Sequence, residues 1–385
     1  IMNIYLILLF ICVFLFMYNY FFYPFLIILI SKLRTDKHHS YATKDNALPV
    51  VSLIIAAYNE EKVIEDKILN SLKLDYPSEL FEIIVVSDGS DDSTNKIVEK
   101  FADKKVVSLH QFERKGKSAA LNRAVENAQG VILVFSDANN DFSEDAIKHL
   151  VKHFNDEKIG AVTGAKKIYE SNSREASKGD GLYWKYESAI KKAESQLGSI
   201  TASEGEILAV RKSMFKPIDP TLINDDAAIT FDLVKSGYRV LYEIDAVAYE
   251  QASIDLIDDI NVKIRMTSGG FQTISREKKF LFPPKNWFAF SFISHKLLRW
   301  LAPHLLILIF FLSIISLENT LVKGFLLLQI LFYVISLYGW FNRKTSLPGW
   351  IYIPMYFTVM NIALLLGFIR YFNKAQGVNW TKAKR

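Results

Sequence analysis

The sequence predicts an α/β domain with a mainly parallel sheet, held to a membrane by apolar helices. Half of the 385 residues are hydrophobic and 23% are charged. Four long runs, residues 1–31, 300–317, 324–342 and 345–369, contain no Asp, Glu, Lys or Arg. Between the first two runs, short β-branched stretches alternate with amphipathic ones, which is typical of a sheet covered by helices. This division excludes a purely soluble protein, a protein confined to the membrane and a disordered chain.

The first uncharged run, residues 1–31, is long enough to cross the hydrocarbon layer as one helix. Basic residues follow it at Lys32, Arg34 and Lys37, and none precedes it. By the positive-inside rule, the chain after this helix lies in the cytoplasm. We therefore expect an N-terminal transmembrane helix followed by a cytoplasmic domain.

The later uncharged runs predict transmembrane helices within residues 300–370. Four spans in all would leave the basic tail, residues 371–385, outside the cell, whereas its charge favours the inside. The alternative is that one segment lies in the interface or re-enters. Residues 283–299 combine Trp and Phe with Lys296 and Arg299, which is typical of an interfacial helix. We expect a multi-pass protein of the plasma membrane.

The charge balance indicates which partners the chain meets. The net charge is +5, and the basic residues cluster beside the apolar runs. Anionic lipid headgroups explain this pattern better than nucleic acid does. The single cysteine, Cys12, excludes an intrachain disulfide and a Cys-based metal site. The oligomeric state is left open by the sequence.

Nine segments between residues 50 and 165 alternate as strand and helix. Each predicted strand is a short apolar run, and each predicted helix spaces its apolar residues three or four apart. The strands are Val50–Ala56, Phe81–Val86, Val106–Leu109, Val131–Phe135 and Ile159–Ala165. The helices are Glu60–Leu72, Asp91–Phe101, Ser118–Ala128 and Ser143–Phe154. Because such sheets bind ligands at the carboxyl ends of their strands, the polar residues directly after each strand are the site candidates.

Polar motifs occupy these positions. AYNEE follows the first strand from Ala57, SDGSDDST follows the second from Ser87, and SDANN follows the fourth from Ser136. The segment KGKSAALN starts at Lys115. Each motif alone is also typical of a turn or a helix N-cap. Together they place carboxylates and a lysine at one edge of the sheet, which suits a nucleoside, a diphosphate and a divalent cation.

The chemistry of three residues supports such a ligand. Asp88 can accept hydrogen bonds from a base or from ribose hydroxyls, and Lys117 offers a positive charge to a phosphate. Asp137 is a hard oxygen ligand, suited to Mg²⁺ or Mn²⁺ bridging a diphosphate. That cation would neutralise a leaving diphosphate as a Lewis acid.

Taken in order, AYNEE, VVSDGSDDST, KGKSAALN and FSDAN resemble the motifs of the family 2 glycosyltransferases. The sequence is especially similar to the membrane-embedded branch that includes synthases of hyaluronan, cellulose, chitin and poly-N-acetylglucosamine. The resemblance covers residues 48–275 and implies a cytoplasmic, Rossmann-like GT-A domain over that range.

The resemblance also implies roles for single residues. It places at the nucleotide sugar Ala57, Tyr58, Glu60, Asp88, Lys117, Asp137 and Arg265. Asp137 and Asn139 would hold the metal, Mg²⁺ or Mn²⁺. Asn139 stands where the family has the second Asp of its D-x-D motif, and its amide offers a weaker, neutral oxygen.

The second half resembles the acceptor side of the family. The sequence NDD, ending at Asp226, matches an acidic pair whose second member is the general base. An inverting transfer needs one carboxylate to take the proton from the attacking hydroxyl. Asp226 is therefore the predicted catalytic residue, and a helix N-cap is the alternative. Glu204, Gly205 and Gln272 are the predicted acceptor-binding residues.

One family motif is mostly missing. Of the family's Q-x-x-R-W, only Arg265 matches, because Val262 and Met266 occupy the Gln and Trp positions. The family associates this motif with polymerising enzymes, so its loss favours a single transfer. We expect an inverting glycosyltransferase that moves a sugar from a UDP-sugar to a glycan or lipid-linked acceptor in cell-surface polysaccharide synthesis. The alternatives are a processive exopolysaccharide synthase that secretes its polymer, a polyprenyl-phosphate glycosyltransferase and a non-catalytic nucleotide-sugar sensor.

Overall fold

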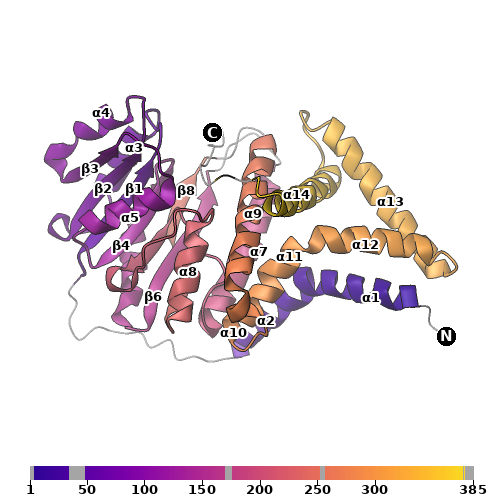
Figure 1. Cartoon of the computed structure of the whole chain (residues 1–385). Coiled ribbons are helices and arrows are strands. Elements are labelled where there is room, and N and C mark those ends of the chain that lie inside the picture. Colours follow the sequence, from indigo (N-terminus) through magenta and orange to yellow (C-terminus); the bar gives the residue numbers. More distant parts are fainter. Residues whose placement is uncertain (1–3, 34–47, 170–175, 252–255, 376, 378–385) are drawn as a thin grey trace.

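An eight-stranded sheet lies on one side of the molecule and long apolar helices lie on the other (Figure 1). The structure is a computed structural model that describes residues 4–33, 48–169, 176–251, 256–375 and 377, the side chains of residues 176–183 excepted. The tall helices α7 (Ala176–Leu197) and α9 (Leu256–Leu281) stand between the sheet and the apolar helices. Most of the site described below lies on the sheet side of this boundary, and α9 itself contributes to it.

The sheet is mixed, with strand order β3-β2-β1-β4-β7-β6-β8-β5. Its strands are β1 Val51–Ala57, β2 Phe81–Asp88, β3 Val106–Gln111, β4 Ile132–Asp137, β5 Asn140–Phe142, β6 Ile159–Ile168, β7 Leu208–Arg211 and β8 Arg239–Glu250. The five predicted strands are all present. The expected parallel pairing holds from β3 to β4, but β7 runs antiparallel to both β4 and β6. The sheet is therefore less parallel than predicted.

Helices cover both faces of the sheet. They are α3 Ile64–Leu72, α4 Thr94–Glu99, α5 Lys117–Asn127, α6 Ala146–Val151 and α8 Asp225–Lys235. Leu53 and Ile55 of β1 pack in the apolar layer under α3, α4 and α6, whereas Ile54 packs in the layer under α5 and α8. This alternation follows from the two-residue period of a strand. With both faces buried, β1 reads as a continuous apolar run.

The strand register places the carboxyl ends of β1, β2 and β4 at the same height along the sheet. Ala57 of β1 pairs with Ser87 of β2, and Ala56 pairs with Asp137 of β4. Asp88 and Asp137, the last residues of β2 and β4, therefore lie at the same edge of the sheet. This is the edge that the sequence predicted for the ligand.

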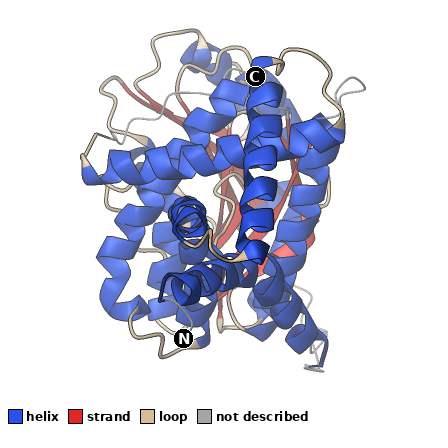
Figure 2. Ribbon diagram, turned by 90° about the vertical axis from the view of Figure 1, so that its right-hand side faces the viewer, coloured by secondary structure: helices blue, strands red, loops and turns tan. Residues whose placement is uncertain are grey.

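Within the described residues, three helices are long and apolar enough to cross a membrane. They are Ile4–Leu33 (α1 Ile4–Met17, η1 Tyr18–Phe22 and α2 Tyr23–Leu33), α13 (Thr320–Phe341) and α14 (Gly349–Phe372). A fourth span is possible if a pair bent by 59°, Trp287–Trp300 and Ala302–Ile315, counts as one. Figure 2 shows these helices in front of the sheet.

The predicted interfacial helix, residues 283–299, corresponds to the first arm of the bent pair. It consists of α10 (Trp287–Phe292), η6 (Ile293–Leu297) and α11 (Leu298–Trp300), and the second arm is α12 (Ala302–Ile315). Helix α1 packs on α12, and α14 packs on α9. The apolar helices are thus joined to the α/β part through α9 and the bent pair.

Candidate active site

Asp88 holds the loop that leads into α5. Its carboxylate accepts hydrogen bonds from the main-chain amides of Lys115, at 3.0 Å, and Gly116, at 2.7 Å. Asp88 is only 1% exposed. Gly116 has φ +92°, a left-handed conformation that costs glycine little. The carboxylate therefore sets the position of the next residue, Lys117.

Lys117 joins the end of β4 to the start of α8. Its ammonium lies 2.7 Å from Oδ1 of Asp137 and 3.6 Å from Oδ2 of Asp225. Although burial alone lowers the pKa of Lys117, these two carboxylates raise it well above its usual value. One ammonium is thus shared by acidic groups that lie far apart in the sequence.

Asp226 occupies the first turn of α8. It is half-buried, and its Oδ1 accepts a hydrogen bond of 2.8 Å from the Ala227 amide. Burial and the adjacent Asp225 carboxylate raise the pKa of Asp226 to about 7, although the Ala227 amide and Lys117 oppose the shift. A carboxylate with a pKa near neutrality is suited to accept a proton from a hydroxyl group.

Gly205 connects the predicted acceptor segment to this carboxylate. A Cβ atom added at Gly205 would lie 3.4 Å from Cβ of Asp226 and 3.9 Å from Nζ of Lys117. Its neighbour Glu204 forms an ion pair with Lys191 of α7. Asp88, Lys117, Asp137 and Asp226 therefore belong to one site, and Glu204 and Gly205 border it on the side of α7.

The residues after β4 fit a divalent cation. The Asp137 side chain is 38% exposed, so its carboxylate remains accessible beside Lys117. The Asn139 amide nitrogen donates to Oε1 of Glu250 at 3.1 Å, and its carbonyl oxygen can serve as a ligand. A carboxylate and an amide oxygen are hard donors of the kind that Mg²⁺ and Mn²⁺ take.

Gln272 and Arg265 lie on α9, beside the start of α8. The Gln272 amide donates to the carbonyl of Thr221 at 2.9 Å and accepts from the amide of Ile223 at 3.0 Å. It therefore braces the chain that leads into α8. Arg265 is half-buried, and the carbonyl of the adjacent Met266 accepts a hydrogen bond from the Asn224 side chain.

The remaining predicted donor residues surround the end of β1. Ala57 is buried, and the ring of Tyr58 lies 3.6 Å from the Arg114 guanidinium. The Glu60 amide donates to the Thr94 hydroxyl at 2.8 Å. These contacts tie the end of β1 to the start of α4 and to the loop that Asp88 holds.

Two lysines near the site were not predicted from the sequence. Lys67 of α3 is 1% exposed, and its ammonium donates to Oδ1 of Asn140 at 2.9 Å, beneath the loop that follows Asp137. Lys166 of β6 lies 3.1 Å from Oε1 of Glu206 and pairs with Glu250. A signal for Lys67 was available, because it falls at helical spacing among the apolar residues of its helix. Lys166 carried none.

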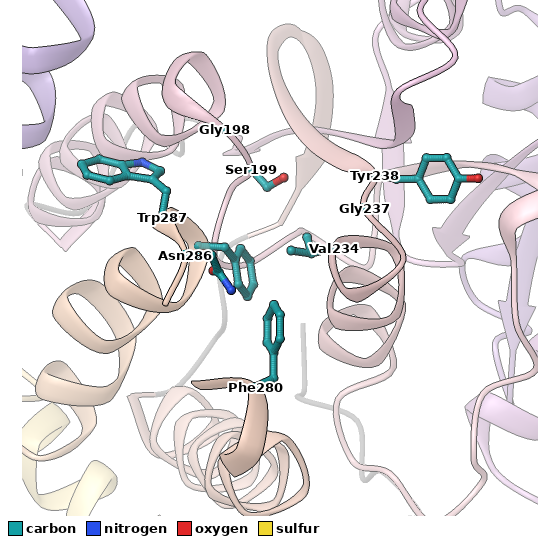
Figure 3. A pocket seen from close by; sticks show the side chains of 9 residues that line it. Gly198, Ser199, Val234, Gly237, Tyr238, Phe280, Asn286 and Trp287 are labelled. Atoms are coloured by element: carbon teal, nitrogen blue, oxygen red, sulfur yellow. The ribbon is translucent and has the colours of Figure 1, made fainter. Parts of the chain in front are cut away.

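The cavity in Figure 3 lies elsewhere. It has a volume of about 280 Å³ and lies between α8, α10 and the chain that follows α7. Phe280, Trp287 and Phe288 line it together with Ser199 and Asn286. None of the predicted site residues borders this cavity.

The arrangement of strands, acidic strand ends and helix-borne carboxylate is that of the GT-A fold. Comparison with known proteins agrees. Residues 52–218 match the model of the glycosyl transferase family 2.

Two curated relatives are poly-beta-1,6-N-acetyl-D-glucosamine synthases. The one from Staphylococcus aureus (strain COL) is 28% identical over 232 residues, and the one from Staphylococcus epidermidis is 28% identical over 234 residues. Each match covers 59% of this chain and 56% of the relative. The chain thus spans little more than half the length of these relatives.

A solved structure shares the fold. It is the mannosyltransferase PcManGT from Pyrobaculum calidifontis in complex with GDP-Man and Mn²⁺, with a TM-score of 0.74 and 21% sequence identity. The match covers 96% of this chain and 100% of that one. The likeness therefore extends beyond the family 2 domain into the helices on the other side of α9.

Proposed function

We propose that this chain is a membrane-bound inverting glycosyltransferase that moves a sugar from a UDP-sugar to a hydroxyl of a glycan or lipid-linked acceptor in cell-surface polysaccharide synthesis. The observation that carries the proposal is the position of Lys117 between Asp137 and the acidic pair of α8. The Lys117 ammonium thus links Asp137, on the proposed donor side, to Asp225, on the proposed acceptor side.

The donor binds along the carboxyl ends of β1, β2 and β4. The nucleoside is bordered by Ala57, Tyr58 and Glu60. Asp88 binds the base and ribose, and it also holds the loop at Gly116 through its main-chain hydrogen bonds. Lys117 and Arg265 supply positive charge to the diphosphate, which both side chains bind well. The half-buried Asp137 and Asn139 would hold Mg²⁺ or Mn²⁺, which supplies Lewis-acid neutralisation of the diphosphate when bound.

Asp226 acts as the general base. Its carboxylate takes the proton of the acceptor hydroxyl as that oxygen forms a bond to the anomeric carbon of the donor sugar. The bond between that carbon and the diphosphate breaks, and the nucleoside diphosphate leaves. Attack opposite to the leaving group in a single step inverts the anomeric configuration. The pKa of Asp226, about 7, suits this exchange at neutral pH.

The chain organisation follows from this assignment. Residues 48–275 form the cytoplasmic catalytic domain, residues 1–31 and 300–370 hold it in the plasma membrane, and residues 283–299 lie at the interface. The basic tail, residues 371–385, lies outside the described residues except at its beginning. The acceptor then approaches Asp226 from the side of α7 and α9, where the apolar helices lie.

A donor screen tests the proposal. Membranes containing the full chain are incubated with UDP-, GDP- and dTDP-sugars, with and without Mn²⁺, and released nucleoside diphosphate is measured. We expect release from a UDP-sugar that needs Mn²⁺ or Mg²⁺ and disappears in Asp137→Ala. Asp141→Ala, which changes a nearby carboxylate, is the matched control. Undiminished release by Asp137→Ala would overturn the assignment.

Processive synthesis is the second candidate, favoured by the names of the two staphylococcal relatives. Met266 and Val262 in place of the family's Trp and Gln favour a single transfer. The length of the product formed on a defined acceptor separates the two. A single added sugar supports transfer, and a polymer supports the synthase.

A further inference from the structure

A group of basic side chains lies between the catalytic domain and the apolar helices, outside the site described above. It consists of Lys263 on α9, Lys296 on η6 and Arg299 on α11, gathered around Glu187 of α7. Arg299 pairs with Oε1 of Glu187, and the Lys296 ammonium lies 3.3 Å from its Oε2. Lys263 lies close enough to interact electrostatically with all three. We call these four residues the junction cluster.

The junction cluster has more positive than negative charge. His295 contacts Glu187 at 3.3 Å, and its other ring nitrogen lies 2.8 Å from Glu194, a second carboxylate near Lys296. Two lysines and an arginine therefore face two carboxylates, Glu187 and Glu194. Within the described part of the chain, the Lys263 ammonium has no hydrogen-bond acceptor or ion-pair partner. Burial and the neighbouring cations lower the pKa of Lys263 to about 8, although Glu187 opposes the shift. Buried charge of one sign calls for a counter-charge.

The junction cluster lies between the N-terminal apolar helix and the general base. On one side, the Arg299 guanidinium lies 5.5 Å from the ring of Tyr20, in the N-terminal apolar helix. On the other side, Lys191 lies one helical turn from Glu187 and pairs with Glu204, which precedes Gly205 at Asp226. A group bound here would lie between the N-terminal apolar helix and the segment that carries Gly205 beside Asp226.

We propose that the junction cluster binds the phosphate or diphosphate of a membrane-anchored, lipid-linked acceptor. Arginine and lysine are the side chains that bind phosphate oxygens most strongly. Basic pockets between membrane helices on the cytoplasmic side are suited to lipid phosphates. The lipid tail then lies among the apolar helices, and the sugar hydroxyl reaches Asp226. This inference rests on the proposed function and narrows its acceptor to a lipid phosphate.

Lys263→Gln is the informative variant. Because the Lys263 side chain makes no hydrogen bond to the rest of the described chain, its replacement does not break a contact that holds the fold. Lys263→Arg keeps the charge. Lys278→Gln is the matched control, since Lys278 is an exposed lysine of the same helix. Unfolding temperature and gel filtration check that all variants fold like the parent chain.

The probe is a radiolabelled polyprenyl diphosphate, whose retention is measured on the full chain in phosphatidylcholine nanodiscs. We expect retention by the parent chain and by Lys263→Arg, and weaker binding by about tenfold in Lys263→Gln, the loss typical of one charge-assisted contact. Lys278→Gln should match the parent chain. Equal retention by Lys263→Gln, or none by the parent chain, would overturn the proposal.

Two competition arms identify the source of the phosphate. Inorganic pyrophosphate should displace the probe, because the cations recognise the diphosphate. Phosphatidylglycerol at equal concentration should not, and full displacement by it would overturn the acceptor assignment in favour of bulk lipid. Release of UDP in the same nanodiscs, without acceptor, reports on the proposed function separately. UDP release without probe binding refutes the lipid phosphate alone, whereas probe binding without UDP release refutes the transferase.

Discussion

The ammonium of Lys117 lies 2.7 Å from the carboxylate of Asp137, although the two residues come from a helix start and a strand end. Asp88 fixes this geometry by holding the two main-chain amides directly before Lys117. The same ammonium lies 3.6 Å from Asp225. A single loop thus connects the end of β2, the end of β4 and the start of α8.

Replacing Lys117 tests this connection. In Lys117→Met, the carboxylates of Asp137, Asp225 and Asp226 lose their shared cation and repel one another. We expect kcat to fall by about a hundredfold and the donor KM to rise, since the charge that faces the diphosphate is also lost. Steady-state kinetics of UDP release measures both, with the exposed Lys96→Met as control. Parent kinetics in Lys117→Met would separate this lysine from the reaction.

The cation site makes a prediction about Asn139. A carboxylate is a stronger ligand than an amide, so Asn139→Asp should lower the Mn²⁺ concentration needed for half-maximal activity, and Asn139→Ala should raise it, each by about tenfold. EDTA should abolish activity and Mn²⁺ should restore it. Titration of UDP release with Mn²⁺ measures the effect. An identical Mn²⁺ requirement in all three proteins would contradict a role for this residue at the metal.

The buried Lys67 predicts a pH-dependent stability. Burial lowers its pKa to about 7, although Asp141 and Asp137 oppose the shift, whereas an unfolded lysine has a pKa of about 10.4. Between these values the unfolded chain binds the extra proton, so this group makes the folded state more stable as pH rises from about 7 to 10. Lys67→Met should lose that rise, as measured by thermal unfolding at pH 7 and 9.

The same variant should also lose activity. Without the Lys67 ammonium, Asn140 loses one of its two hydrogen-bond donors, and the loop after Asp137 is held less firmly. We expect kcat to fall by about tenfold. Lys73→Met is the control for both measurements, because Lys73 is an exposed lysine that directly follows the last residue of α3. Unchanged pH dependence of unfolding in Lys67→Met would show that this lysine is not a buried charge.

The raised pKa of Asp226 predicts the pH profile. A general base acts in its deprotonated form, so kcat/KM should rise with pH through a midpoint near 7. Asp225→Asn removes a neighbouring negative charge and should move this midpoint to lower pH, whereas Asp232→Asn, further along the same helix, should leave it in place. A profile that is flat between pH 5.5 and 8.5 would contradict the assignment.

The first half of the fold was accessible from the sequence, because its signals are local. The strands β1 to β4 are short runs rich in apolar residues, and Asp88 and Asp137 follow from where those runs end. The antiparallel β7 was not predicted, since only four residues form it and its direction depends on the chain between it and β6. Strand pairing of this kind is decided by long-range packing.

The contacts between the predicted site residues could not be derived from the sequence. Gln272 was expected at the acceptor, yet both ends of its amide bind the main chain before α8. The ion pair of Lys191 with Glu204 and the junction cluster each join residues from separate elements, which no spacing along the chain indicates. The remaining sequence signal for such contacts is a charged residue among the apolar positions of a helix, as at Lys67 and Glu187.

The most direct measurement of the central claim compares Asp226→Asn with Asp232→Asn, both changes of Asp to Asn on α8. Sugar transfer to a hydroxyl acceptor and binding of the UDP-sugar are measured for each in nanodiscs. The account predicts that Asp226→Asn binds the donor normally but transfers at least about a hundredfold more slowly, while Asp232→Asn matches the parent chain. Transfer at the parent rate by Asp226→Asn would contradict it.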